Sequence, residues 1–160
     1  LGLGAVTYLD PRADRLASAR ALCGIPSASP SEDGVDLAYE LSGRPEVLET
    51  ALSLCRREGR VVVGSWYGSR AAPIHFGTRA HRRHQSIHFS NVSTISSALA
   101  GRFDKARRMA VAMSWLQRLP LEPLVTHRVP IARCAEAFAV LDESPPGCLQ
   151  VVLTYPPLEA

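Results

Sequence analysis

Three histidines have a spacing that suggests chemistry. On a helix, His81, His84 and His88 would lie on one face, where imidazole nitrogens can bind zinc or copper. Residues 85–90 look like a strand instead, which would separate His88 from the other two. No acidic residue close in sequence could orient the imidazole rings. The sequence therefore predicts no metal site.

The same stretch is strongly basic. Residues 79–84 contain three arginines and two histidines, a set that could contact phosphate groups. A solvent-exposed loop before a strand accounts for the same residues, and the formal net charge of the whole chain is only +3. We therefore predict no nucleic-acid partner.

Length and composition set the class of protein. The chain has 160 residues, of which 46% are hydrophobic, enough for a compact domain with a core. Its four cysteines are scattered without a C-x-x-C pair, so we expect free, mostly buried thiols. No apolar run reaches the roughly 20 residues that cross a membrane, and no export signal is present, so we predict a cytoplasmic protein with no membrane partner. Because the first residue is Leu1 rather than Met, we expect part of a longer protein.

The elements that would position a site alternate between strands and helices. An apolar, β-branched run at residues 5–9 predicts a strand that ends at Asp10, and a helix follows from Pro11 to about Gly24. A second helix is predicted at about residues 45–57, and further strands at residues 35–41, 60–66 and 86–92. This alternation is typical of a parallel α/β sheet.

The pattern changes after about residue 94. A long helix is predicted at roughly residues 103–119, and the chain then alternates between strand and helix at residues 125–129, 131–141 and 149–155. We therefore predict two domains, 1–103 and 104–160, the second being a short α+β segment. Its last strand, residues 149–155, is expected to find no partner strand within this chain.

Short segments throughout the chain carry a family resemblance. They are AVTYLDP (5–11), GVDLAYELSG (34–43), LETAL (48–52), GRVVVG (59–64), PLVTHRVPI (123–131), AEAF (135–138) and QVVL (150–153). In this order and spacing they resemble the C-terminal part of the medium-chain dehydrogenase/reductase family, the zinc-type alcohol dehydrogenases. The resemblance covers nearly the whole chain.

The resemblance implies that Asp10 binds a cofactor. A carboxylate at the carboxyl end of a strand can accept both hydroxyls of an adenosine ribose and would repel a 2′-phosphate, so NAD is expected rather than NADP. The alternative is that Asp10 caps the following helix. Arg15 either approaches the same ribose or pyrophosphate or is a solvated helix charge.

Four further positions are carried over from the family as cofactor-binding. Ser42 and Gly43 close one predicted strand and Gly64 closes another, where a glycine lets the backbone approach a ribose. Strand-to-helix turns would need the same residues. By analogy, Val92 lies where backbone groups would contact the nicotinamide amide.

One part of a dinucleotide fold is missing from the sequence. Residues Leu1–Gly4 superficially resemble the G-x-G-x-x-G turn, but no strand precedes them. The resemblance places them at the end of the first crossover helix, so the first strand and its glycine loop would lie upstream. The fold expected is an incomplete Rossmann-like parallel sheet lacking that strand, with a C-terminal α+β return segment. Either upstream sequence supplies the strand, or residues 5–9 pair directly with residues 35–41, or the chain is a poorly folded remnant.

Two functions remain open. The first is the nucleotide-binding portion of an NAD-dependent, zinc-dependent alcohol or polyol dehydrogenase. This chain would carry no catalytic residue, would bind NAD weakly or not at all, and would pack on a missing N-terminal catalytic domain; zinc belongs only to a complete family member. The second is a non-catalytic remnant or a dimerising module, with homodimers forming by sheet extension through strands near residues 73–76 and 86–92.

Overall fold

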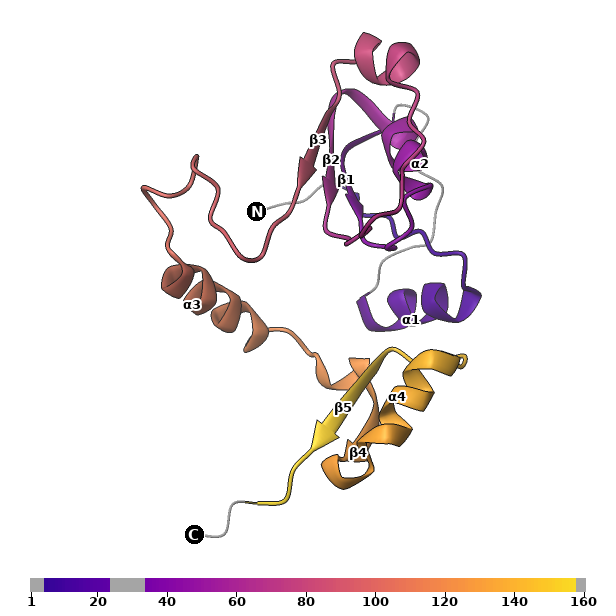
Figure 1. Ribbon diagram of the computed structural model, residues 1–160, viewed down its shortest axis with the longest axis vertical. Coiled ribbons are helices and arrows are strands. Elements are labelled where there is room, and N and C mark those ends of the chain that lie inside the picture. Colours follow the sequence, from indigo (N-terminus) through magenta and orange to yellow (C-terminus); the bar gives the residue numbers. More distant parts are fainter. Residues whose placement is uncertain (1–4, 24–33, 158–160) are drawn as a thin grey trace. The chain divides into compact units, whose positions relative to one another are not determined.

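The computed structural model describes residues 5–23 and 34–157, which fall into two compact units (Figure 1). One unit consists of residues 30–109. The other combines the two ends of the chain, residues 1–29 and 110–160. Among the described residues, no helix is both long enough and apolar enough to cross a membrane.

The first unit is built on a parallel sheet of three strands. They are β1 (Val35–Glu40), β2 (Cys55–Val63) and β3 (Ser86–Phe89), which lie in that order. Helix α2 (Val47–Leu54) connects β1 to β2. The predicted parallel α/β class is therefore confirmed.

A single apolar layer between α2 and the sheet forms the core of this unit. The helix contributes residues at i, i+3 and i+4 spacing, and β2 contributes alternate residues because successive side chains point to opposite faces. The buried cluster comprises Leu48, Ala51, Leu52, Cys55, Val61 and Val63.

Strand β2 begins earlier than the sequence indicates. Cys55 is already paired with Val35, whereas the next pair in register joins Leu37 to Arg60. The intervening residues form a bulge in which Glu58 adopts a positive φ of 61°. The predicted end of the helix at residue 57 is therefore wrong, because residues 55–57 belong to the strand.

Basic residues before β3 donate hydrogen bonds to the C-terminal end of α2. Arg79 donates from Nη1 to the carbonyl oxygen of Ser53 at 3.1 Å, and Arg83 donates to that of Cys55 at 2.9 Å. Gln85 Nε2 donates to the carbonyl oxygens of Leu52 and Cys55. Carbonyls at the C-terminus of a helix lack partners within the helix and carry partial negative charge. Part of the basic cluster is therefore a C-terminal cap.

The predicted strand at residues 5–9 is wrong. Residues 5–10 form no strand, and β1 pairs only with β2 among the described residues. A strand is stable only when a neighbour satisfies its backbone groups, and the expected strand order would place another strand between residues 5–9 and β1.

One face of β1 has no cover in the first unit. Leu37, Tyr39 and Leu41 are exposed, whereas Ala38 and Glu40 point toward the α2 side. In a doubly wound fold, helices cover both faces of the sheet. The exposed residues therefore mark where such a cover would lie.

The second unit contains a β–α–β segment. Strand β4 (Val125–Pro130) pairs in parallel with β5 (Gln150–Thr154), and α4 (Cys134–Glu143) connects them. Helix α1 (Ala13–Cys23) belongs to the same unit, and α3 (Lys105–Leu116) precedes the β–α–β segment in the chain. The expected α+β segment is present. Its final strand finds a partner in β4, although the sequence suggested that it would find none.

All four cysteines are free thiols. Cys55 and Cys148 are buried, as expected, whereas Cys23 is exposed and Cys134 is partly buried.

A matched pair of leucine substitutions tests the position of the core. Leu48 is 2% exposed, whereas Leu41 is 71% exposed. We expect Leu48→Ala to lower the free energy of unfolding by about 2–5 kcal/mol because it leaves a cavity. Leu41→Ala should lower it by less than about 0.5 kcal/mol. Urea denaturation measures both values, and equal losses would contradict the described core.

Candidate functional site

A buried carboxylate lies at the carboxyl edge of the three-stranded sheet. Glu40, the last residue of β1, is 2% exposed. Its carboxylate accepts hydrogen bonds from the backbone amide of Ser42 at 2.7 Å, from the Ser42 hydroxyl and from the Tyr67 hydroxyl. Glu40 lies within the family segment at residues 34–43, but the resemblance implied no role for it. The signal was an acidic residue at a core-facing position of an apolar strand.

The backbone around Glu40 links the ends of two strands. Gly64 donates its amide to the Glu40 carbonyl oxygen at 3.0 Å, and the Ser65 hydroxyl bonds the same oxygen at 3.3 Å. Ser65 Oγ also accepts the Gly43 amide at 2.8 Å. Three predicted residues, Ser42, Gly43 and Gly64, are therefore brought together around Glu40 and Ser65.

The turn at Gly43 is open to its surroundings. Gly43 has a φ of +73°, and a Cβ built on it would meet no atom within 4 Å. Positive φ favours glycine, and the free space leaves the backbone accessible. Arg70 Nη2 donates to the Gly43 carbonyl oxygen at 2.7 Å. A ligand could therefore approach this turn closely, beside a fixed positive charge.

Hydrogen bonding keeps Glu40 ionised. Burial alone would raise the pKa of Glu40, but bonds from Ser42, Tyr67 and Ser65 together outweigh it and lower that pKa. Burial and the bond to Glu40 raise the pKa of Tyr67, so its hydroxyl stays protonated and donating. Because protein donors already occupy the Glu40 carboxylate, we assign it the role of holding the turn rather than of transferring protons.

Asp10 lies in the second unit, ahead of α1, and is partly buried. Its Oδ1 accepts the Arg12 amide at 2.9 Å and its Oδ2 accepts the Tyr8 hydroxyl at 3.0 Å. The bond to Arg12 is the local turn expected of an Asp before a helix. An ionised carboxylate offers about four acceptor positions, so these two bonds leave about two for a ligand.

Arg15 and Val92 have contrasting surroundings. Arg15 Nε is buried and has no hydrogen-bond partner among the described residues, and its positive charge acts on Tyr8. Val92, which follows β3, is 80% exposed, and its carbonyl oxygen accepts Arg108 Nη2 at 2.6 Å. Asp10 and Arg15 belong to one unit, and the other four predicted positions belong to the other.

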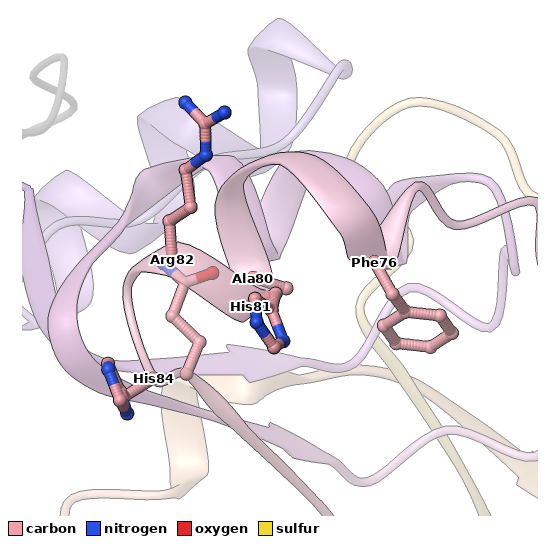
Figure 2. A pocket seen from close by; sticks show the side chains of 6 residues that line it. Phe76, Ala80, His81, Arg82 and His84 are labelled. Atoms are coloured by element: carbon pink, nitrogen blue, oxygen red, sulfur yellow. The ribbon is translucent and has the colours of Figure 1, made fainter.

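Two of these histidines, His81 and His84, line a hollow beside the turn η1 (Phe76–Ala80). Its lining comprises Phe76, Ala80, His81, Arg82, His84 and Gln85. In Figure 2, His81 and Phe76 lie on the same side of the turn, and Arg82 points away from them. His88 lies in β3, so the three histidines do not share a helix. No group of three potential metal ligands occurs within the described ranges.

A pH titration of stability tests the Glu40 network. The pKa of Glu40 is lower in the folded chain than in the unfolded chain, where it is about 4.3. The stabilisation is therefore present above about pH 4.3 and is lost as the pH falls through the lower, folded value. We expect Glu40→Gln to cost about 1–3 kcal/mol at pH 7 and to weaken the decline in stability below pH 4.3.

The control is Glu143→Gln, which neutralises an exposed carboxylate at the end of α4. It should leave the pH profile close to that of the parent chain. If Glu40→Gln and Glu143→Gln give the same profile, the role assigned to Glu40 is wrong.

Comparisons with known proteins confirm the predicted resemblance. No family model matches the chain. Alcohol dehydrogenase 6 of Peromyscus maniculatus is 29% identical over 122 residues, which are 76% of this chain and 30% of that protein. This chain thus spans less than a third of its curated relative.

Solved structures show the same fold. An alcohol dehydrogenase (rspB) of E. coli CFT073, complexed with NADH, aligns with a TM-score of 0.74 and 20% identity over 94% of this chain and 44% of its own. Alcohol dehydrogenase TADH of Thermus sp. ATN1 aligns with a TM-score of 0.72 and 20% identity, over 98% of this chain and 45% of its own. L-Idonate 5-dehydrogenase of Escherichia coli K-12 aligns with a TM-score of 0.71 and 18% identity, over 96% of this chain and 43% of its own. The chain is therefore similar to the C-terminal part of zinc-type medium-chain alcohol dehydrogenases.

Proposed function

We propose that this chain is the NAD-binding portion of an NAD-dependent alcohol or polyol dehydrogenase. The observation that carries the proposal is the open Ser42–Gly43 turn, fixed by Glu40 at the carboxyl edge of a parallel sheet. Ligands of open α/β sheets bind outside this edge. The similarity to alcohol dehydrogenases supports the same assignment.

The described residues fit the adenosine half of NAD. Asp10 retains acceptor positions for two ribose hydroxyls, and the unpartnered Arg15 Nε suits a nearby phosphate or ribose oxygen. The Asp10 carboxylate would repel a 2′-phosphate, which favours NAD over NADP. When bound, NAD accepts a hydride from the alcohol.

Zinc does not fit the described residues, which hold no suitable group of ligands. In the proposed complete enzyme, the metal and the substrate pocket would come from an N-terminal catalytic domain. Residues 1–103 would then be a partial dinucleotide-binding domain, and residues 104–160 would pack on the catalytic domain. We propose that the 160-residue chain alone has no dehydrogenase activity, and its cytoplasmic location stays a prediction.

A second candidate function is a dimerising module that binds no cofactor. It is favoured by β3, which lies at the edge of the described sheet and pairs only with β2 there. An unpaired edge strand is a template for a strand of a second copy. Analytical ultracentrifugation distinguishes the two candidates, because a cofactor-free module would be a dimer under conditions where NAD has no effect.

Calorimetric titration with NAD tests the assignment of Asp10. We expect Asp10→Ala to weaken NAD binding by about 10- to 100-fold, because bonds to a charged acceptor contribute about 1.5–3 kcal/mol. Asp142→Ala, which removes an exposed carboxylate of α4 in the same unit, is the control and should leave the affinity unchanged. Equal affinities for Asp10→Ala and the parent chain would remove Asp10 from the cofactor site.

The gene itself tests whether the fold is completed upstream. We expect the coding sequence directly before Leu1 to encode a strand followed by G-x-G-x-x-G, within a unit of roughly 30 residues. A start codon directly before Leu1 would favour the dimerising module instead.

A further inference from the structure

We propose that Arg12 and Asp14 are positioning residues, which hold the Asp10 carboxylate in place by tying its loop to the turn after α4. The effect on the cofactor rests on the proposed function, in which Asp10 binds the adenosine ribose. The tie, by which we mean the hydrogen bonds of Arg12 and Asp14 to residues 144–147, consists of contacts within the second unit alone.

The Arg12 guanidinium contacts residues about 130 positions away. Its Nη1 donates to both the carbonyl oxygen and the hydroxyl of Ser144, each at 2.9 Å, and its Nη2 donates to the carbonyl oxygen of Pro145 at 3.0 Å. Asp14 contributes the reciprocal bond, since its Oδ2 accepts the Gly147 amide at 2.9 Å. Arg12, just before α1, and Asp14, in the first turn of α1, are thus bonded at several points to residues 144–147.

The two side chains also bind each other. Arg12 donates from Nε to Asp14 Oδ1 at 3.0 Å and from Nη2 to Oδ2 at 2.7 Å. This bidentate pair fixes the plane of the guanidinium. Bonds from Arg12 and from the Gly147 amide lower the pKa of Asp14, so the pair stays charged at neutral pH. The side chains are only 28% and 29% exposed.

The end of α4 explains why an arginine is suited to this place. The helix ends at Glu143, and Ser144 adopts the left-handed conformation with a φ of 43°. Carbonyl oxygens that follow a helix need donors from elsewhere. The rigid guanidinium fork supplies several donors at once, whereas a lysine ammonium provides a single point of charge.

The same residue orients Asp10. The backbone amide of Arg12 donates to Asp10 Oδ1 at 2.9 Å, two residues from the carboxylate that we assign to the ribose. Any displacement of Arg12 therefore moves a donor that fixes Asp10. Tyr8 holds the other oxygen, so the carboxylate is fixed on both sides while Arg12 stays in place.

This arrangement differs from a second bidentate ion pair in the same unit, which is more exposed. Arg133 and Glu136 also form a bidentate pair, but they are three residues apart on the start of α4 and their bonds join no distant segments. Arg133→Gln is therefore a matched control for Arg12→Gln, since both variants remove one guanidinium from an ion pair.

Hydrogen exchange on the whole chain tests the tie. We expect Arg12→Gln to speed amide exchange at Arg12 and Gly147 by about tenfold or more, because both amides lose a fixed acceptor. Arg12→Lys should speed exchange nearly as much, and Arg133→Gln should have no effect. Unchanged exchange at both amides in Arg12→Gln would overturn the proposal.

Calorimetry with AMP and NAD tests the consequence for binding. We expect Arg12→Gln to lower the affinity for both ligands by the same factor, about tenfold, with an unchanged number of binding sites. Partial unfolding would instead reduce the number of sites. If Asp10→Ala weakens binding and Arg12→Gln does not, the positioning role is wrong. If the parent chain binds neither ligand, or if Asp10→Ala has no effect, the cofactor assignment fails, and the exchange experiment alone decides whether the tie exists.

Discussion

A buried carboxylate needs donors for its charge, and this requirement shapes the candidate site. Glu40 ends β1 on the face that α2 covers, where an ionised group without partners would be costly. Ser42 and Tyr67 meet the requirement, and their bonds fold the chain back over the strand end. Ser65 extends the network to Gly43. The open turn that we assign to cofactor binding is thus a consequence of satisfying one charge.

The sequence was sufficient to predict the core but not the pairing of strands at the edge of the sheet. The apolar spacing along α2 and the Val61–Val63 run agree with the buried layer, because periodicity indicates which side chains share a face. The strand at residues 5–9 was wrong since a strand also needs a neighbour, and local composition does not show whether one is present. Likewise, the sequence suggested no partner for the strand near residues 150–154, which pairs with β4.

The candidate site was predictable in part, and only through a family resemblance. Ser42, Gly43 and Gly64 do gather at one edge, because parallel strands end together. Glu40 was missed, since no short motif distinguishes a buried carboxylate from an exposed one. The contacts of Arg12 with residues 144–147 were equally hidden, because they join segments about 130 positions apart. The basic cluster at 79–84 proved to be partly a helix cap.

In the proposed function, the Ser42–Gly43 turn, which the Glu40 network holds at the carboxyl edge of the sheet, contacts the dinucleotide. Nuclear magnetic resonance of the ¹⁵N-labelled chain titrated with NAD measures this directly. We predict that the amide signals of residues 42–44 shift with one dissociation constant. Shifts confined to residues outside this turn, or none at millimolar NAD, would contradict the assignment.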